Sequence, residues 1–311
     1  MNEDLCRFRP PQKGTLLIWE ITNLCNLECA HCCNKSSPLA DTSLEVSKDK
    51  AIAIINEFEK LNITEVYFSG GEPFIQNDFV DIISHINTDK TVIYVASNAI
   101  LLTKDKVNEL KGISIKRMTI SLDGHTPEIH NKVRRRPFAF DKTVDGISNC
   151  ISSGIPVRIS GVITPDNAEF VEEFIEFVAS LKVKAIVLHT VLPVGRAKQN
   201  KELISGKEFN EKIIEKINNA KRKFPDVVID HSFEDDTSLS DKGCQAGKRL
   251  LHITSNGDVS PCSWLYKIDA RRFTLGNIKE ATLEQCLLNN DKVMNPVLEL
   301  APNCPIASIE K

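Results

Sequence analysis

The chain has 311 residues, of which 41% are hydrophobic, and its 39 lysines and arginines nearly balance 42 aspartates and glutamates. This length and apolar content suffice for a large buried core in one or two domains, and a net charge of -3 excludes the basic field that attracts nucleic acid. No apolar run could cross a bilayer and the first ten residues lack a secretion signal, so we expect no membrane partner and a cytoplasmic location. In a reducing cytosol, ten cysteines predict metal ligands or reactive thiols rather than disulfides.

Short apolar runs alternate with amphipathic segments along the first two thirds of the chain. Strand-like runs rich in Val and Ile lie at residues 15–22, 65–70, 91–98, 115–124, 157–164 and 184–191. Helical patterns with one apolar face lie at residues 47–61, 167–181 and 207–224. Repeated strand-helix units predict an α/β fold with a parallel sheet, and about six units are too few for a closed eightfold barrel.

The alternation stops near Pro225. A polar, loop-like stretch follows at residues 231–243, and residues 247–262 are hairpin-like because "SNGD" supplies the Asn-Gly of a tight turn. We therefore expect two units, residues 13–224 and a smaller α+β region at residues 225–311.

Four cysteines fall within nine residues directly behind the first strand. Loops that leave the carboxyl ends of parallel strands form the active-site face of such folds, so the run is a candidate site. Cys25, Cys29 and Cys32 form CxxxCxxC, three soft ligands on one loop. An iron-sulfur cluster held by three thiolates keeps one iron open, whereas a structural zinc site is normally closed by four ligands. A zinc knuckle is the alternative interpretation.

This run resembles the signature of the radical S-adenosylmethionine (SAM) enzymes, and the resemblance extends over about residues 13–200. It implies a partial (β/α)6 barrel with a [4Fe-4S] cluster on Cys25, Cys29 and Cys32 whose open iron binds SAM. In that family one electron cleaves SAM to methionine and a 5'-deoxyadenosyl radical, which abstracts a substrate hydrogen. The resemblance also implies a one-electron reductant such as flavodoxin or ferredoxin.

Further segments resemble the family's SAM-binding segments in the expected order. His31 stands where relatives carry a ring near the adenine, "SGGEP" resembles the segment along the methionine moiety, and Arg134 aligns with an arginine that binds the SAM carboxylate. The implied cofactor residues are His31, Gly70, Gly71, Glu72, Pro73, Ser97, Asn98, Ser121, Asp123, Arg134 and Leu192. The alternatives are a polar loop for His31, an ordinary turn for "GGEP", helix caps for Ser97, Ser121 and Asp123, and a solvated arginine run for Arg134.

The C-terminal cysteines resemble the start of a SPASM or twitch extension. Cys244 precedes the predicted hairpin and Cys262 follows it, which brings two distant thiols to one end of a ribbon. A full SPASM extension carries more cysteines than the Cys286 and Cys304 that remain. We therefore expect one auxiliary iron-sulfur cluster on Cys244, Cys262 and Cys304 with an unidentified fourth ligand, or else a degenerate extension. Cys150 and Cys286 lie in helical patterns and are expected to be buried as small apolar residues.

Relatives with this extension act on ribosomally made peptides, on protein side chains or on small molecules. We expect modification of a peptide or protein side chain, although about a dozen residues before the first strand leave no leader-binding domain. The alternatives are a small-molecule radical oxidoreductase, acting as a dehydrogenase or decarboxylase, and a non-catalytic iron-sulfur protein. No residue is assigned a catalytic role at this level.

Overall fold

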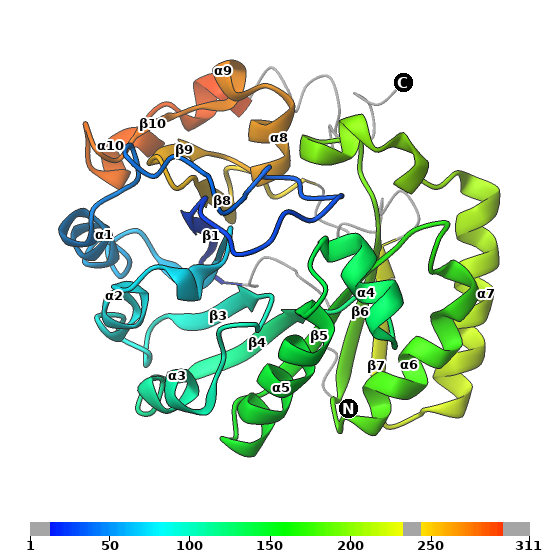
Figure 1. Cartoon of the computed structure of the whole chain (residues 1–311). Coiled ribbons are helices and arrows are strands. Elements are labelled where there is room, and N and C mark those ends of the chain that lie inside the picture. The colour runs from blue at the N-terminus through cyan, green and yellow to red at the C-terminus, as the bar shows by residue number, and fades with distance from the viewer. Residues whose placement is uncertain (1–12, 233–243, 295–311) are drawn as a thin grey trace.

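The computed structural model describes residues 13–232 and 244–294. Within these residues one sheet runs in the order β10-β9-β8-β1-β2-β3-β4-β5-β6-β7, and β1 to β7 are parallel (Figure 1). The strands are β1 (Thr15–Thr22), β2 (Ile63–Gly70), β3 (Val92–Ser97), β4 (Ile115–Ser121), β5 (Val157–Ile163), β6 (Ala185–Thr190), β7 (Val228–Ser232), β8 (Leu250–Ile253), β9 (Asp258–Ser260) and β10 (Gly276–Asn277). All six predicted strands are confirmed, and so is the α/β fold class.

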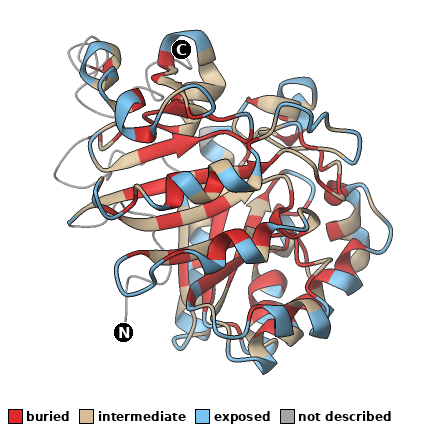
Figure 2. Cartoon of the chain, turned by 90° about the vertical axis from the view of Figure 1, so that its left-hand side faces the viewer, coloured by how far each residue is buried: buried red, intermediate tan, exposed pale blue. Residues whose placement is uncertain are grey.

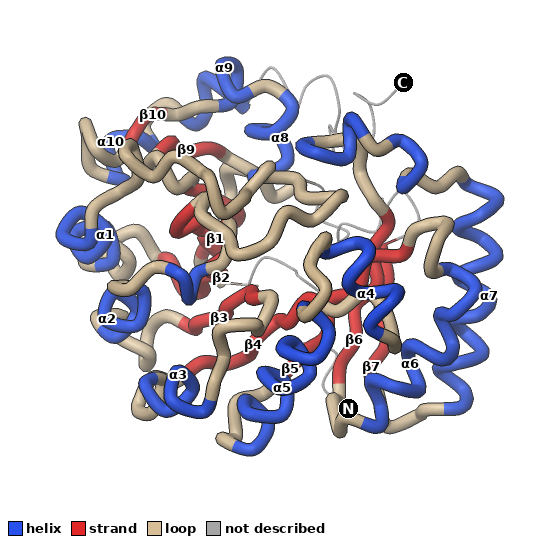
Figure 3. Tube along the Cα trace, viewed as in Figure 1, coloured by secondary structure: helices blue, strands red, loops and turns tan. Residues whose placement is uncertain are grey.

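Helices cover the outer side of the curved sheet (Figures 1 and 3). They are α1 (Lys48–Ile55), α2 (Phe79–Ser84), α3 (Lys104–Glu109), α4 (Pro127–Arg134), α5 (Ala139–Ser152), α6 (Val171–Ser180), α7 (Lys207–Lys223), α8 (Ser263–Ile268), α9 (Ala270–Phe273) and α10 (Leu283–Leu287). Short 3-10 turns are η2 (Pro73–Ile75), η3 (Ala168–Phe170), η4 (Gly195–Gln199) and η5 (Lys201–Leu203). None of the helices in the described ranges is long and apolar enough to span a bilayer.

The core lies between the strands and the inward faces of these helices (Figure 2). Trp19 on β1 stacks on Phe68 of β2 with ring centroids 5.8 Å apart, and both side chains are fully buried. The predicted apolar helix faces pack against the core, although α1 ends at Ile55, earlier than the pattern over residues 47–61 indicated. The buried members are Ala51, Ile54, Ile55, Phe58, Phe174, Val178, Ile213, Ile217 and Ala220, and the half-buried members are Phe170, Leu181 and Phe224. Apolar periodicity thus located these helices because each buries one stripe against the sheet.

A seventh parallel strand, β7, pairs with β6 and was not predicted. Its sequence, "VIDHS", has only two apolar residues, which is why the apolar pattern breaks near Pro225. The prediction that the strand-helix alternation stops there was wrong. The expected domain boundary at residues 224 and 225 stays a prediction.

The predicted hairpin is confirmed, since β8 and β9 are antiparallel around a turn at Gly257, whose φ is +89°. β8 also pairs parallel with β1, from Leu16 opposite Leu250 to Trp19 opposite Ile253. This pairing makes the C-terminal region continuous with the sheet and places it beside the strand that leads into the cysteine run. The loop expected at residues 231–243 is wrong for His231 and Ser232, which lie in β7, and its residues 233–243, like Cys304, lie outside the described residues.

Candidate active site

The cysteine loop leaves the carboxyl end of β1 and is anchored where it starts. Glu45 accepts hydrogen bonds from the Thr22 hydroxyl at 2.9 Å and from the Asn23 N–H at 2.6 Å. The Cys25 N–H donates to the Ser37 carbonyl at 3.1 Å, which joins the two ends of the loop. The loop is therefore a closed, fixed structure at the active-site edge of the sheet.

The three predicted ligands share one apolar wall. Cys25 and Cys29 are buried in a cluster with Leu27 and Ala139, and half-buried Cys32 packs against it. Burial, followed by the Glu72 carboxylate and the neighbouring thiols, raises the pKa of Cys25 to about 12, so this thiol stays protonated until a metal displaces its proton. Within the described residues, no three His, Cys, Asp or Glu side chains converge on a position for a single metal ion.

The segment after β6 holds the loop by its backbone. The Arg196 guanidinium donates to the carbonyls of Cys29 and Ser36, each at 2.7 Å, and the Arg196 N–H donates to the Cys32 carbonyl at 2.9 Å. Gly195 has a φ of +60°, and a Cβ there would come within 2.3 Å of the Cys33 carbonyl oxygen. From this segment, the sequence resemblance named only Leu192 as a cofactor residue. The role of Arg196 as a loop anchor was missed.

Arg134 is buried, 6% exposed, and forms an ion pair with buried Asp123. Its Nε lies 2.7 Å from Asp123 Oδ2, its Nη2 donates to Oδ1 at 3.0 Å, and its Nη1 reaches Cys29 Sγ at 3.5 Å. Burial opposes ionisation of Asp123, but the guanidinium outweighs it and lowers the pKa of that carboxyl. Arg134 is therefore not part of a solvated arginine run, and it joins α4 to the cysteine loop.

The glycine-rich segment packs directly onto the start of the loop. A Cβ on Gly70 would lie 2.3 Å from the Thr22 carbonyl oxygen, and one on Gly71 would lie 2.0 Å from that of Leu24. Glu72 is fully buried and accepts hydrogen bonds from the Ser97 hydroxyl at 2.9 Å and the Asn98 N–H at 2.7 Å. Burial raises the pKa of Glu72 to about 7. Glu72 thus connects the ends of β2 and β3.

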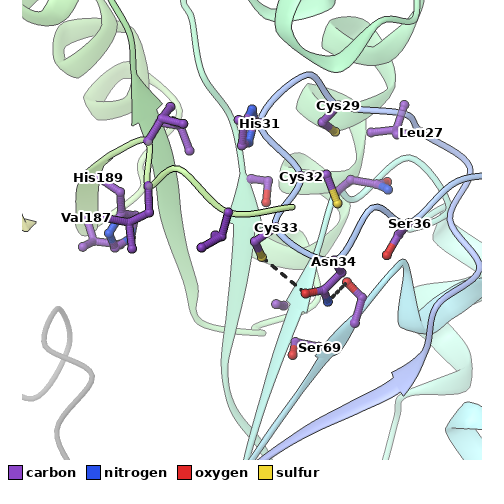
Figure 4. A pocket seen from close by; sticks show the side chains of 18 of the residues that line it. Leu27, Cys29, His31, Cys32, Cys33, Asn34, Ser36, Ser69, Val187 and His189 are labelled. Atoms are coloured by element: carbon purple, nitrogen blue, oxygen red, sulfur yellow. Dashed lines mark hydrogen bonds between the residues drawn. The ribbon is translucent and has the colours of Figure 1, made fainter. Parts of the chain in front are cut away.

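A cavity of about 640 Å³ opens beside the loop (Figure 4). It brings together most of the predicted site: Cys25, Cys29, His31, Cys32, Gly70, Gly71, Ser97, Asn98, Ser121, Arg134 and Leu192. Glu72, Pro73 and Asp123 are not among its lining residues, and the contacts of Glu72 and Asp123 are with protein groups. The cofactor roles of all these residues stay predictions.

A second group of cavity-lining residues was missed. It includes His189 on β6, which lies across the cavity from the cysteine loop (Figure 4), Asp230 and Ser232 on β7, Arg158 of β5 and Trp264 of α8. His189 Nδ1 lies 2.8 Å from the Ser232 hydroxyl oxygen, and burial, with Arg158 nearby, lowers the pKa of His189 to about 4. His189 could have been noticed as a polar residue at a strand's carboxyl end, but the β7 residues lie on the strand that was not predicted.

Cys244 and Cys262 lie in one buried cluster with Leu265, Phe273 and Met294. Cys262 directly precedes α8, and Trp264 of the same helix lines the cavity. The C-terminal region therefore brings two distant thiols together next to the active-site wall, as the hairpin predicted. Their role as cluster ligands stays a prediction, because their expected partner Cys304 lies outside the described residues. Cys150 and Cys286 are buried in α5 and α10, which confirms the expectation for both.

The residues present fit an iron-sulfur cluster with a polar cofactor beside it. Three soft thiols share one wall, and His31 Nδ1 is buried without a hydrogen-bond partner in the part of the chain that the structure describes. Burial lowers the pKa of His31 to about 4, with Arg134 and Arg196 contributing, so its neutral ring can accept or donate a hydrogen bond to a bound molecule.

Comparisons with known proteins agree with this geometry. The family model for the radical SAM superfamily matches residues 19–181, more than half of the chain, and the model for SPASM, an iron-sulfur cluster-binding domain, matches residues 244–304. The AdoMet-dependent heme synthase of Methanosarcina barkeri is 26% identical over 95% of this chain and 89% of the relative. The PqqA peptide cyclase of Rhizobium meliloti is also 26% identical, over 90% of this chain and 74% of the relative.

Among solved structures, Streptococcus suis SuiB bound to S-adenosylmethionine matches with a TM-score of 0.71 at 20% identity. The match covers 89% of this chain and 65% of SuiB, so the chain spans less than two thirds of that protein's length. At this identity the match shows a shared fold.

Proposed function

Because the chain belongs to the radical SAM superfamily and carries a SPASM iron-sulfur domain, we propose that it abstracts a hydrogen atom from a side chain of a ribosomally made peptide or of a protein. The family and the relatives named as synthases and cyclases make the chain an enzyme, so the non-catalytic iron-sulfur alternative is set aside. Its cofactors are a [4Fe-4S] cluster and SAM, with an auxiliary iron-sulfur site in the SPASM domain.

When bound, the cluster and SAM supply the radical that takes the substrate hydrogen. We assign the cluster to Cys25, Cys29 and Cys32, supported by their shared apolar wall. Arg134, held by Asp123 beside Cys29, would bind the carboxylate of SAM through a charge-assisted contact. His31, with its unsatisfied nitrogen, would contact the adenine at the same wall.

The similarity to a peptide cyclase over 90% of this chain and 74% of that relative is the observation that carries the peptide proposal. The cavity of about 640 Å³ beside the cysteine loop would then receive a side chain of the peptide, with His189 and Ser232 among its lining residues.

Isotope transfer tests this proposal. Reduced, reconstituted enzyme is incubated with SAM and a perdeuterated peptide encoded by a gene adjacent to its own. We expect one deuterium in 5'-deoxyadenosine and a matching mass change in the peptide. SAM cleavage without deuterium transfer from any adjacent peptide would count against a peptide substrate.

A second candidate is radical oxidation or decarboxylation of a carboxylated small molecule such as a tetrapyrrole. The heme synthase relative covers 95% of the chain, and Arg158, whose planar fork suits carboxylates, lines the cavity. Incubation with a carboxylated tetrapyrrole should then release carbon dioxide in step with 5'-deoxyadenosine, and Arg158→Gln should weaken binding of that substrate while SAM binding persists.

A further inference from the structure

Exposed basic side chains gather on the surface beside the cysteine loop. Lys198 of η4 and Lys201 of η5 are exposed and line a surface hollow. Arg135, exposed at the end of α4, donates from Nη2 to Asn200 Oδ1 at 3.1 Å, so it meets these lysines where η4 joins η5. Glu202 offsets part of this charge. We call Arg135, Lys198 and Lys201 the basic surface.

The basic surface lies directly over the backbone between two predicted cluster ligands. Asn200 Nδ2 donates to the Ala30 carbonyl at 3.1 Å, and the Ala30 N–H donates to the Val133 carbonyl at 3.0 Å. Ala30 follows Cys29 in the chain, and Cys32 is two residues further on. One hydrogen bond and a few covalent bonds therefore separate this surface from the loop that would carry the cluster.

We propose that the basic surface docks an acidic one-electron carrier protein that reduces the cluster of the cysteine loop. The proposal rests on the proposed function, because that cluster must gain one electron before each cleavage of SAM. The carrier loses one electron and the oxidised cluster gains it. No bond is formed or broken, and no proton is transferred.

Charge complementarity supports this partner. The net charge of the chain is -3, so an acidic carrier is repelled by the protein as a whole and needs a local positive surface to approach the site. Such surfaces mainly raise the rate of association and determine orientation, and their effect weakens with salt. In the described part of the chain neither Lys198 nor Lys201 pairs with a carboxylate, which leaves both available to a partner.

The test compares two charge-reversed variants. Lys198→Glu with Lys201→Glu changes the basic surface and leaves Arg135 and its bond to Asn200 in place. Lys111→Glu with Lys116→Glu is the matched control. Both lysines are exposed at the amino end of β4, whereas the cysteine loop lies at the carboxyl ends of the strands. Cluster reduction is followed by stopped-flow absorbance with reduced flavodoxin, with reduced ferredoxin, and with photoreduced deazariboflavin as a small uncharged donor.

We expect the Lys198/Lys201 variant to be reduced about tenfold more slowly than the native protein by at least one carrier at low salt, and the control variant to match the native rate. The carrier that shows the loss identifies whether the partner is flavin-based or iron-sulfur-based. Reduction by deazariboflavin should be unchanged. Unchanged rates with both carriers, an equal loss in the control, or an equal loss with deazariboflavin would each overturn the docking surface. Failure of the native protein to cleave SAM with deazariboflavin would instead refute the proposed function.

Discussion

The Arg134 guanidinium contacts a carboxylate and a thiol at the same time. Asp123 binds its Nε and Nη2, the Val162 N–H fixes Asp123 in turn at 3.0 Å, and Nη1 points to Cys29. A fork held this way would be preorganised for an anion beside the predicted cluster ligand Cys29. The family resemblance suggested Arg134 as a SAM-binding residue. Three adjacent arginines look alike in the sequence, and only the fold shows that Arg134 is buried whereas Arg135 is exposed.

Replacing Arg134 should weaken SAM binding. Loss of a charge-assisted partner costs roughly 1.5 to 3 kcal/mol, so Arg134→Ala should raise the SAM dissociation constant by about tenfold or more. Isothermal titration of reconstituted protein measures it, with Arg136→Ala as the neighbouring control and iron content and circular dichroism matched between variants. An unchanged dissociation constant would leave Arg134 with a structural role alone.

Glu20 on β1 contacts a lysine and a histidine inside the fold. Lys267 Nζ lies 2.5 Å and His252 Nε2 3.3 Å from its Oε1, and all three side chains are largely buried. Burial opposes its ionisation, but His252 and Lys267 outweigh this and lower the pKa of Glu20 from 4.5 to about 2. The carboxylate therefore contributes roughly 3 kcal/mol of stability above pH 4.5, which is lost as pH falls toward 2.

Glu20→Gln should consequently reduce the free energy of unfolding more at pH 6 than at pH 3. Urea unfolding of native and variant protein at the two pH values measures the difference, and Glu208→Gln, at an exposed ion pair with Lys212, is a control expected to show little change at either pH. Equal destabilisation by Glu20→Gln at both pH values would mean that the ion pair does not set this pH dependence.

At the scale of elements, the cysteine loop is shaped by the segment that follows β6. Arg196 and Asn200 bind the loop carbonyls of Cys29, Ala30, Cys32 and Ser36, although they are distant from them in sequence. Apolar runs made β1 to β6 predictable because each of these strands buries at least three of its side chains. The loop anchors and β7 were not predictable, since the former depend on long-range contacts and the latter has two apolar residues in five.

Gly195→Ala should lower cluster affinity by about tenfold, because the added Cβ would displace the carbonyls of Cys32 and Cys33. Gly154→Ala is the matched control: its φ is +78°, but no atom lies within 4 Å of a Cβ there. Both changes cost about 1 to 2 kcal/mol of backbone strain. Iron and sulfide content after reconstitution should fall only for Gly195→Ala. An equal loss in both variants would mean that backbone strain, rather than displacement of the loop carbonyls, causes the effect.

At the scale of the molecule, one sheet joins the two regions that carry cysteines. β8 extends the sheet beside β1, and α8 brings Trp264 to the cavity wall directly after Cys262. The sequence predicted the hairpin and the two thiols beside it. It could not predict that this region would complete the wall of the same cavity, because no local pattern encodes the pairing of β8 with β1.

We expect Cys244→Ala with Cys262→Ala to leave SAM cleavage intact and to abolish substrate modification, since these thiols lie in a cluster separate from the cysteine loop. Iron content should fall by about four atoms or fewer. Assays of 5'-deoxyadenosine and of modified substrate, run on the same samples, separate the two effects. Full product formation by the double variant would make the C-terminal thiols structural.

We propose that Cys25, Cys29 and Cys32 together hold the cluster that cleaves SAM. The most direct measurement is the yield of 5'-deoxyadenosine from SAM by anaerobically reconstituted, reduced protein, compared with a variant in which all three cysteines are replaced by alanine. The native protein should convert SAM, and the triple variant, folded by circular dichroism, should form no 5'-deoxyadenosine. Conversion of SAM by the triple variant would contradict the assignment of the site.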